Sequence, residues 1–174
     1  MRARAADSLP WENYTPYEWR TVGTLVRLGM VAEAHEMMDY FMRDRRPAAW
    51  HHWAEVVWRE PETPRFIGDM PHTWVGSDFI RSVLDLFAYE HEADGSLVVA
   101  AGIPDRWLAG GDTLSVRGLR TWYGPLDVAL RKDASGATRV TLGGLTRIPP
   151  GGIVVRRPDG RQQVVRRLGE VVLP

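Results

Sequence analysis

A carboxylate among tryptophans is the first feature of this sequence that could do chemistry. Glu55 lies between Trp53 and Trp58, directly before a proline-rich stretch that is expected to form a rim loop. A carboxylate can accept a proton from water, and an indole ring offers an apolar face on which a sugar ring can stack. The alternative is a solvated glutamate on an amphipathic helix beside packed tryptophans.

Tryptophan is concentrated in the first half of the chain, where six of the eight occur. We expect Trp50, Trp53 and Trp74 to serve as platforms for a sugar, because they fall close to predicted loops. Trp11 and Trp19 are expected in packing around the entry to the first helix. Large aromatic side chains are more often part of a core than of a binding site, so a core position is the alternative for each platform.

Asp69 and His72 flank Pro71 at the predicted start of a helix. A carboxylate and an imidazole at such a place could contact the hydroxyl groups of a sugar. The alternative is that Asp69 caps the helix and His72 hydrogen-bonds a backbone carbonyl. Both residues are therefore candidate binding residues with a structural alternative.

Metal and cofactor chemistry is not expected. His51 and His52 are neighbours that cannot point at one site from a helix or strand, and no third ligand follows at a ligating spacing. Cysteine is absent, which excludes thiolate ligands and disulfides. The glycine pairs lie between short β-rich runs as turns, and no phosphate-binding or dinucleotide motif occurs.

Composition narrows the class of protein further. The 174 residues are 44% hydrophobic and 25% charged, with 22 basic and 22 acidic side chains, which is close to a globular average. No apolar run approaches the ~20 residues needed to span a bilayer, and no apolar leader follows Met1. We expect a cytoplasmic protein that binds neither membrane nor nucleic acid.

The first half of the chain is predicted to be mainly helical. A capping-box pattern at residues 15–18 predicts a helix over 16–28, and apolar spacings of three and four predict a second over 31–43. Residues 50–58 fit helical and extended periods equally, and prolines predict a loop over 59–70. A third helix is expected to end near Tyr89.

The second half of the chain is predicted to consist of short strands. From Gly95 onward, eight short β-rich runs alternate with turn residues, which is typical of an antiparallel β-sandwich. We therefore predict an α+β chain with a helical part over residues 1–94 and a sandwich over 95–174.

Three segments of the sequence also resemble a known family. The phrases WAEVVWRE, PHTWVGSDF and GIPDRWL resemble the C-terminal end of bacterial six-hairpin glycosidases of the glucoamylase-like and rhamnosidase-like kind, over about residues 9–173. Their catalytic domain is an (α/α)6 toroid closed by a small β-sandwich. The resemblance implies that this chain holds the last helices of a toroid and its C-terminal sandwich.

The resemblance also implies a role for each candidate residue. A pair of carboxylates cleaves the glycosidic bond in such enzymes, and Glu55 would be the general base that activates water. The general acid commonly comes from an earlier helix or loop, so this chain alone is expected to be inactive. Its partners would be carbohydrate and either an upstream helical chain or a second copy. The alternative is a non-catalytic relative that binds glycan or another subunit.

Overall fold

The chain folds into two compact units. The computed structural model describes residues 1–45, 48–60 and 65–173. The units are Met1–Val83, which is mainly helical, and Leu84–Pro174, which is mainly β. The expected α+β class is confirmed. The boundary expected after residue 94 falls in the turn between the first two strands of the second unit, because residues 88–91 already belong to its sheet.

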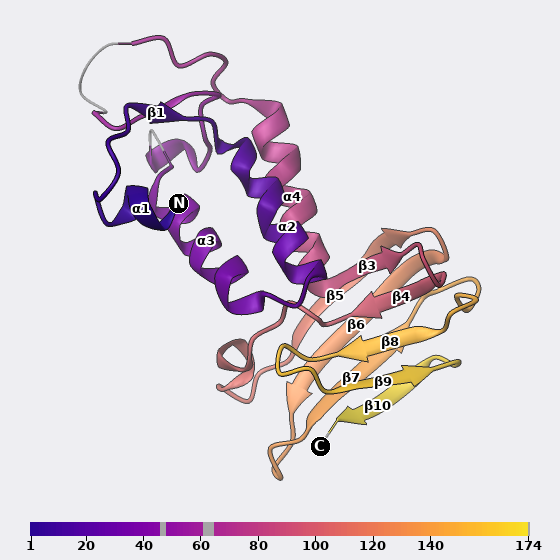
Figure 1. Ribbon diagram of the computed structural model, residues 1–174. Coiled ribbons are helices and arrows are strands. Elements are labelled where there is room, and N and C mark those ends of the chain that lie inside the picture. The colour runs from indigo at the N-terminus through magenta and orange to yellow at the C-terminus, as the bar shows by residue number, and fades with distance from the viewer. Residues whose placement is uncertain (46–47, 61–64, 174) are drawn as a thin grey trace. The chain divides into compact units, whose positions relative to one another are not determined.

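A helical hairpin forms the centre of the first unit (Figure 1). Helix α2 (Arg20–Arg27) and helix α3 (Val31–Arg43) are joined by a short turn. Gly29 adopts φ +78° there, a conformation open to glycine, and the Met30 amide donates to the Leu25 carbonyl at 2.9 Å. The second predicted helix is confirmed over its whole length.

The first helix begins differently from the sequence prediction. Pro16–Trp19 forms a 3₁₀ turn, η1, and the α-helical geometry starts only at Arg20. Thr15 makes no side-chain capping bond, so the capping box does not form. A short helix α1 (Arg2–Ala5) and a 3₁₀ turn η2 (Ala48–Trp50) complete the helical elements before α4.

Aromatic rings fill the core of the first unit. Trp19 is fully buried, and its ring centroid lies 5.1 Å from Phe41, 5.2 Å from Trp53 and 5.0 Å from Phe79. Phe79 belongs to helix α4 (Thr73–Phe87), so the cluster ties this helix to the hairpin. Tilted and edge-to-face ring pairs of this kind add to the free energy of burying the rings.

A small ribbon of extended backbone crosses the first unit. Strand β1 (Asn13–Tyr14) pairs antiparallel with β2 (Val57–Trp58). On the other side of residues 55–58, the Val56 amide donates to the Ile67 carbonyl at 3.0 Å and the Glu55 amide to the Asp69 carbonyl at 3.3 Å. We call residues 55–59, with 12–14 on one side and 66–69 on the other, the ribbon. It holds both ends of the loop predicted over 59–70, of which residues 61–64 lie outside the described part of the chain.

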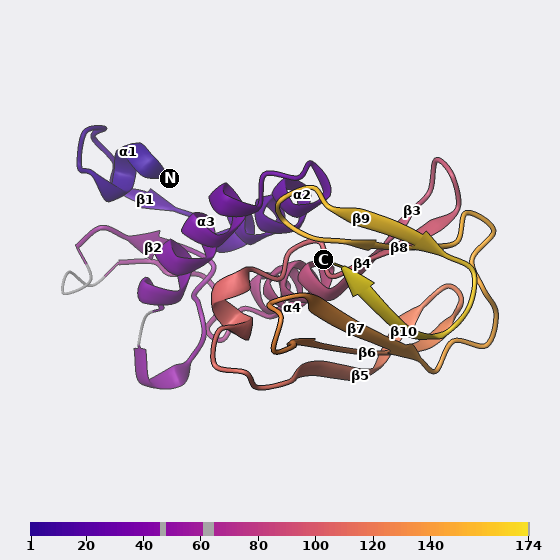
Figure 2. The same cartoon turned by 90° about the horizontal axis from the view of Figure 1, so that it is seen from below.

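The second unit contains two four-stranded sheets that face each other (Figure 2). The first sheet has the order β10-β7-β6-β5 and the second β3-β4-β8-β9. The strands are β3 (Ala88–His91), β4 (Ser96–Val99), β5 (Leu114–Thr121), β6 (Gly124–Lys132), β7 (Thr138–Gly143), β8 (Ile153–Arg156), β9 (Gln162–Val165) and β10 (Gly169–Leu173), with a 3₁₀ turn η3 (Asp105–Leu108) before β5.

Two details of the sandwich correct the sequence prediction. The second sheet is mixed, because β4 pairs parallel with β8 through Leu97 opposite Ile153. All four residues of β4 are buried, as is typical of parallel strands covered on both faces. The third helix stops at Phe87 and not near Tyr89, since Ala88 and Tyr89 pair with Val99 and Val98 as a strand.

Candidate functional site

Glu55 lies at one end of the ribbon, half-buried. Gly68 stands against it so closely that a Cβ at residue 68 would lie 2.6 Å from the Cβ of Glu55 and would overlap its carboxylate. The missing side chain at Gly68 therefore leaves the space that the carboxylate occupies. Asp69, whose side chain is 87% exposed, follows directly on the neighbouring segment.

Tyr17 and His72 lie close to Glu55 and Asp69. The Tyr17 hydroxyl and His72 Nε2 are joined by a short hydrogen bond. His72 is 8% exposed, its amide donates to the Trp53 carbonyl at 3.4 Å, and its Nδ1 lies 3.8 Å from Asp69 Oδ2. Nδ1 itself has no hydrogen-bond partner among the described residues. His72 is thus a buried support for Tyr17, which corrects its expected role as a direct sugar contact.

The charge around Tyr17 defines its protonation state. Its pKa lies above the ordinary value for a phenol, because partial burial and then the negative charge of Glu55 oppose ionisation, with further contributions from Asp78 and Asp69 against the opposing charge of Arg20. The phenol therefore stays protonated near neutral pH, and its hydroxyl shares a hydrogen bond with His72 Nε2.

Trp74 covers this neighbourhood from the first turn of α4. Its side chain is 69% exposed, and its ring centroid lies 6.2 Å from Tyr17 and 6.2 Å from His72. We call Tyr17, Glu55, Asp69, His72 and Trp74 the aromatic–acid cluster. Beside it, Arg20 binds Asp78 of α4 at 2.7 Å, and the Arg20 guanidinium stands 5.3 Å from the centre of the Tyr17 ring.

Two of the expected platforms lie elsewhere. Trp53 is 2% exposed, and its indole Nε1 donates to the Phe41 carbonyl at 2.9 Å, so it is a core residue and has no face for a ligand. This corrects the expectation for Trp53. Trp50 is 59% exposed at the end of η2, but it is not among the rings that contact Tyr17 and His72 in the described part of the chain.

The structure places Glu55, Asp69, His72 and Trp74 close together, and it adds Tyr17 to them. Their contact with a sugar stays a prediction. Sequence reasoning missed Tyr17 because residues 17 and 72 are joined only by the tertiary fold. The one available signal was its place directly after Pro16, at the entry of a helix whose neighbours in sequence are aromatic.

The cluster offers the groups that a sugar requires. Trp74 supplies an exposed ring face, Glu55 and Asp69 supply carboxylate oxygens, and the protonated Tyr17 supplies a hydroxyl. Carboxylates accept hydrogen bonds from sugar hydroxyls and can also take a proton from water. A carbohydrate site and general-base chemistry both fit this donor and acceptor set.

Residues 1–45, 48–60 and 65–173 contain no group of three or more metal-ligating side chains that could hold an ion. The two neighbouring histidines are engaged locally: His52 Nδ1 lies 2.9 Å from the Trp53 amide, and His51 Nδ1 lies 3.2 Å from Arg45 Nη1. No helix in the part of the chain that the structure describes has the length and apolar character needed to cross a membrane.

Comparisons of the chain with protein-family models, with curated proteins and with solved structures found no match. The residues and their geometry are therefore the basis for assigning a function.

Proposed function

We propose that the chain binds carbohydrate at the aromatic–acid cluster, as the C-terminal part of a glycosidase-like protein. The observation that carries the proposal is the exposed ring of Trp74 beside Tyr17, in the same neighbourhood as Glu55 and Asp69. An exposed aromatic face next to carboxylates suits a sugar, which uses both its C–H face and its hydroxyls.

Each residue has a distinct part in this proposal. Trp74 stacks on the sugar ring, Asp69 and Tyr17 form hydrogen bonds with its hydroxyl groups, and His72 holds the Tyr17 hydroxyl in place through their hydrogen bond. Glu55 is the general base that takes a proton from an attacking water, and the general acid comes from another part of the assembly. As part of the same proposal, the first unit supplies the last helices of an (α/α)6 toroid.

Binding to a glycan array tests the proposal without requiring hydrolysis. The full chain and its Trp74→Ala variant are compared on neutral mono- and oligosaccharides, with Trp122→Ala as the matched control. Trp122 is also an exposed tryptophan, at 60%, but it lies in the β unit. We expect binding by the wild type and by the control, and about tenfold weaker binding by Trp74→Ala.

The contribution of Glu55 to saccharide binding is tested on the same arrays. Glu55→Gln keeps the shape and the hydrogen-bonding oxygen of the side chain but cannot act as a base, so we expect its saccharide binding to stay within a few fold of the wild type. A wild-type chain that binds no saccharide, or a Trp74→Ala variant that binds as tightly as the wild type, would contradict the proposal.

A further inference from the structure

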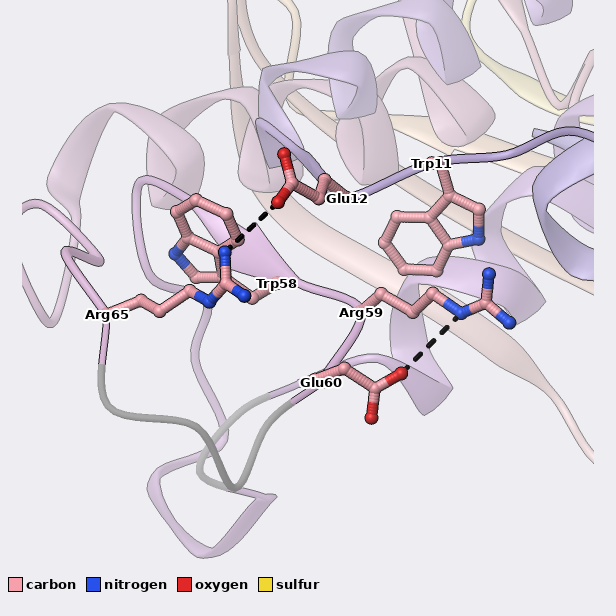
Figure 3. Close-up of a pocket in the computed structure, with 6 residues that line it drawn as sticks. All are labelled: Trp11, Glu12, Trp58, Arg59, Glu60 and Arg65. Atoms are coloured by element: carbon pink, nitrogen blue, oxygen red, sulfur yellow. Dashed lines mark hydrogen bonds and ion pairs between the residues drawn. The ribbon is translucent and has the colours of Figure 1, made fainter.

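A separate pocket opens at the other end of the ribbon. It has a volume of about 150 Å³ and is lined by Trp11, Glu12, Trp58, Arg59, Glu60 and Arg65. Figure 3 shows the two indole rings on its two sides, with the Arg65 guanidinium in front of Trp58, 4.6 Å from the ring centre. Nothing in the cluster around Glu55 uses these side chains.

The size of the pocket limits its occupant to one small ring. A cavity of about this volume accommodates a single six-membered ring. Trp11 and Trp58 are both half-buried and border the cavity, and the Arg65 guanidinium lies over the Trp58 ring. An aromatic wall such as Trp11 favours a ring with an apolar face.

The charges around the pocket balance. Arg65 binds Glu12 at 3.1 Å, and Arg59 lies 3.7 Å from Glu60 and 2.7 Å from Asp7, so each guanidinium has a carboxylate beside it. A ligand with net charge would gain little from such a lining, because one sign of charge always opposes it. Paired guanidinium and carboxylate groups still offer both donors and acceptors, which suits a neutral ring with several hydroxyl groups.

The ribbon connects this pocket to the aromatic–acid cluster. The three segments of the ribbon continue along the chain into both sites. Residues 11–17 lead from Trp11 to Tyr17, residues 55–58 from Glu55 to Trp58, and residues 65–74 from Arg65 to Trp74. The three residue steps from Glu55 to Trp58 cover at most about 10 Å of extended chain, a distance that a short oligosaccharide spans.

We infer that the Trp11–Trp58 pocket is an outer subsite that takes one neutral sugar ring of an oligosaccharide whose other end lies at the aromatic–acid cluster. The inference rests on the proposed function, since it assigns a second contact to the same ligand. It predicts that affinity rises with the length of the saccharide, and that this rise depends on Trp11 and Glu12.

Calorimetric titration against saccharide length tests the inference. The probes are successive oligomers of the neutral glycan that binds best on the array, beginning with the shortest that gives measurable binding. The variants are Trp11→Ala, which removes a wall, and Glu12→Ala, which removes a side chain that is 75% exposed and is safer for folding. Glu92→Ala is the control, because Glu92 is an exposed carboxylate of the β unit.

We expect the two pocket variants to bind the shortest oligomer like the wild type and the longer oligomers about tenfold more weakly, while Glu92→Ala follows the wild type throughout. Undiminished binding of the longer oligomers by both pocket variants overturns the subsite. An equal loss for short and long oligomers also overturns it. If Trp74→Ala still weakens every oligomer in those cases, the proposed function stands; if the wild type binds no saccharide, both fail.

Discussion

Gly68 lies directly against Glu55, on the segment that pairs with it. A Cβ at residue 68 would overlap the carboxylate and stand 2.6 Å from Glu55 Cβ, and the backbone of Gly68 adopts φ +69°. Both features require glycine, the first because of space and the second because a side chain strains the left-handed conformation. The place of Glu55 in the cluster therefore depends on a neighbour that carries no side chain.

Gly68→Ala should cost more stability than the same substitution at a glycine with open surroundings. Gly29 has a similar φ of +78°, but no atom lies within 4 Å of the place that a methyl group would take, so Gly29→Ala isolates the backbone strain, about 1 kcal/mol. The clash with Glu55 should add roughly 1–3 kcal/mol at residue 68. Urea unfolding of the two variants measures the difference, and equal costs would show that Glu55 moves away freely.

Glu55→Gln should lower the pKa of Tyr17. The negative charge of Glu55 opposes ionisation of the phenol, so a neutral amide at residue 55 removes part of the upward shift. Ultraviolet titration of tyrosinate measures the change, with Tyr17→Phe used to assign the signal. Glu12→Gln is the matched control, because Glu12 lies at the other end of the ribbon. An unchanged Tyr17 titration in Glu55→Gln would place Glu55 outside the cluster.

Two tryptophan substitutions should separate core from surface. Trp53→Ala removes a buried ring that contacts Trp19 and Phe79, and we expect it to lower the free energy of unfolding by about 3–5 kcal/mol. Trp74→Ala removes an exposed ring and should cost less than about 1 kcal/mol. Chemical denaturation gives both values. Similar costs for the two variants would contradict the assignment of Trp53 to the core and Trp74 to the surface.

Acid should weaken the β unit through Asp94. A hydrogen bond with His91, followed by bonds from Ser96, lowers the pKa of Asp94 to about 2. Because the folded pKa is depressed, the carboxylate stabilises the fold above its unfolded pKa of about 3.9, and this contribution disappears as pH falls toward 2. Asp94→Asn should show a shallower loss of stability in that range. Parallel pH curves for variant and wild type would exclude this role.

Local pattern was enough to predict the elements whose neighbours lie close in sequence. The helix over 31–43 follows from apolar residues three and four apart, and its end was marked by charged residues and proline. Strand β3 was missed because Ala88 and Tyr89 continue the apolar run of α4, and only pairing with Val99 and Val98 makes them a strand. The parallel pairing of Leu97 with Ile153 has no local signal at all.

The sequence allowed us to predict which types of residue form the candidate site, but not which individual residues of those types belong to it. Trp53 and Trp74 are the same residue type near the same loop, yet one is 2% and the other 69% exposed. Burial of this kind is decided by Trp19, Phe41 and Phe79, which come from three other parts of the chain. Tyr17 joined the cluster for the same reason, through a contact with His72 across 55 residues.

Nuclear magnetic resonance of the indole N–H groups during titration with a bound oligosaccharide would locate the carbohydrate on the chain. We expect the Trp74 signal to shift until the site is saturated. The Trp53 signal, whose Nε1 is bonded to the Phe41 carbonyl, and the Trp122 signal in the β unit should stay in place. A saccharide that shifts Trp122 and leaves Trp74 unchanged would contradict the assignment of carbohydrate binding to the aromatic–acid cluster.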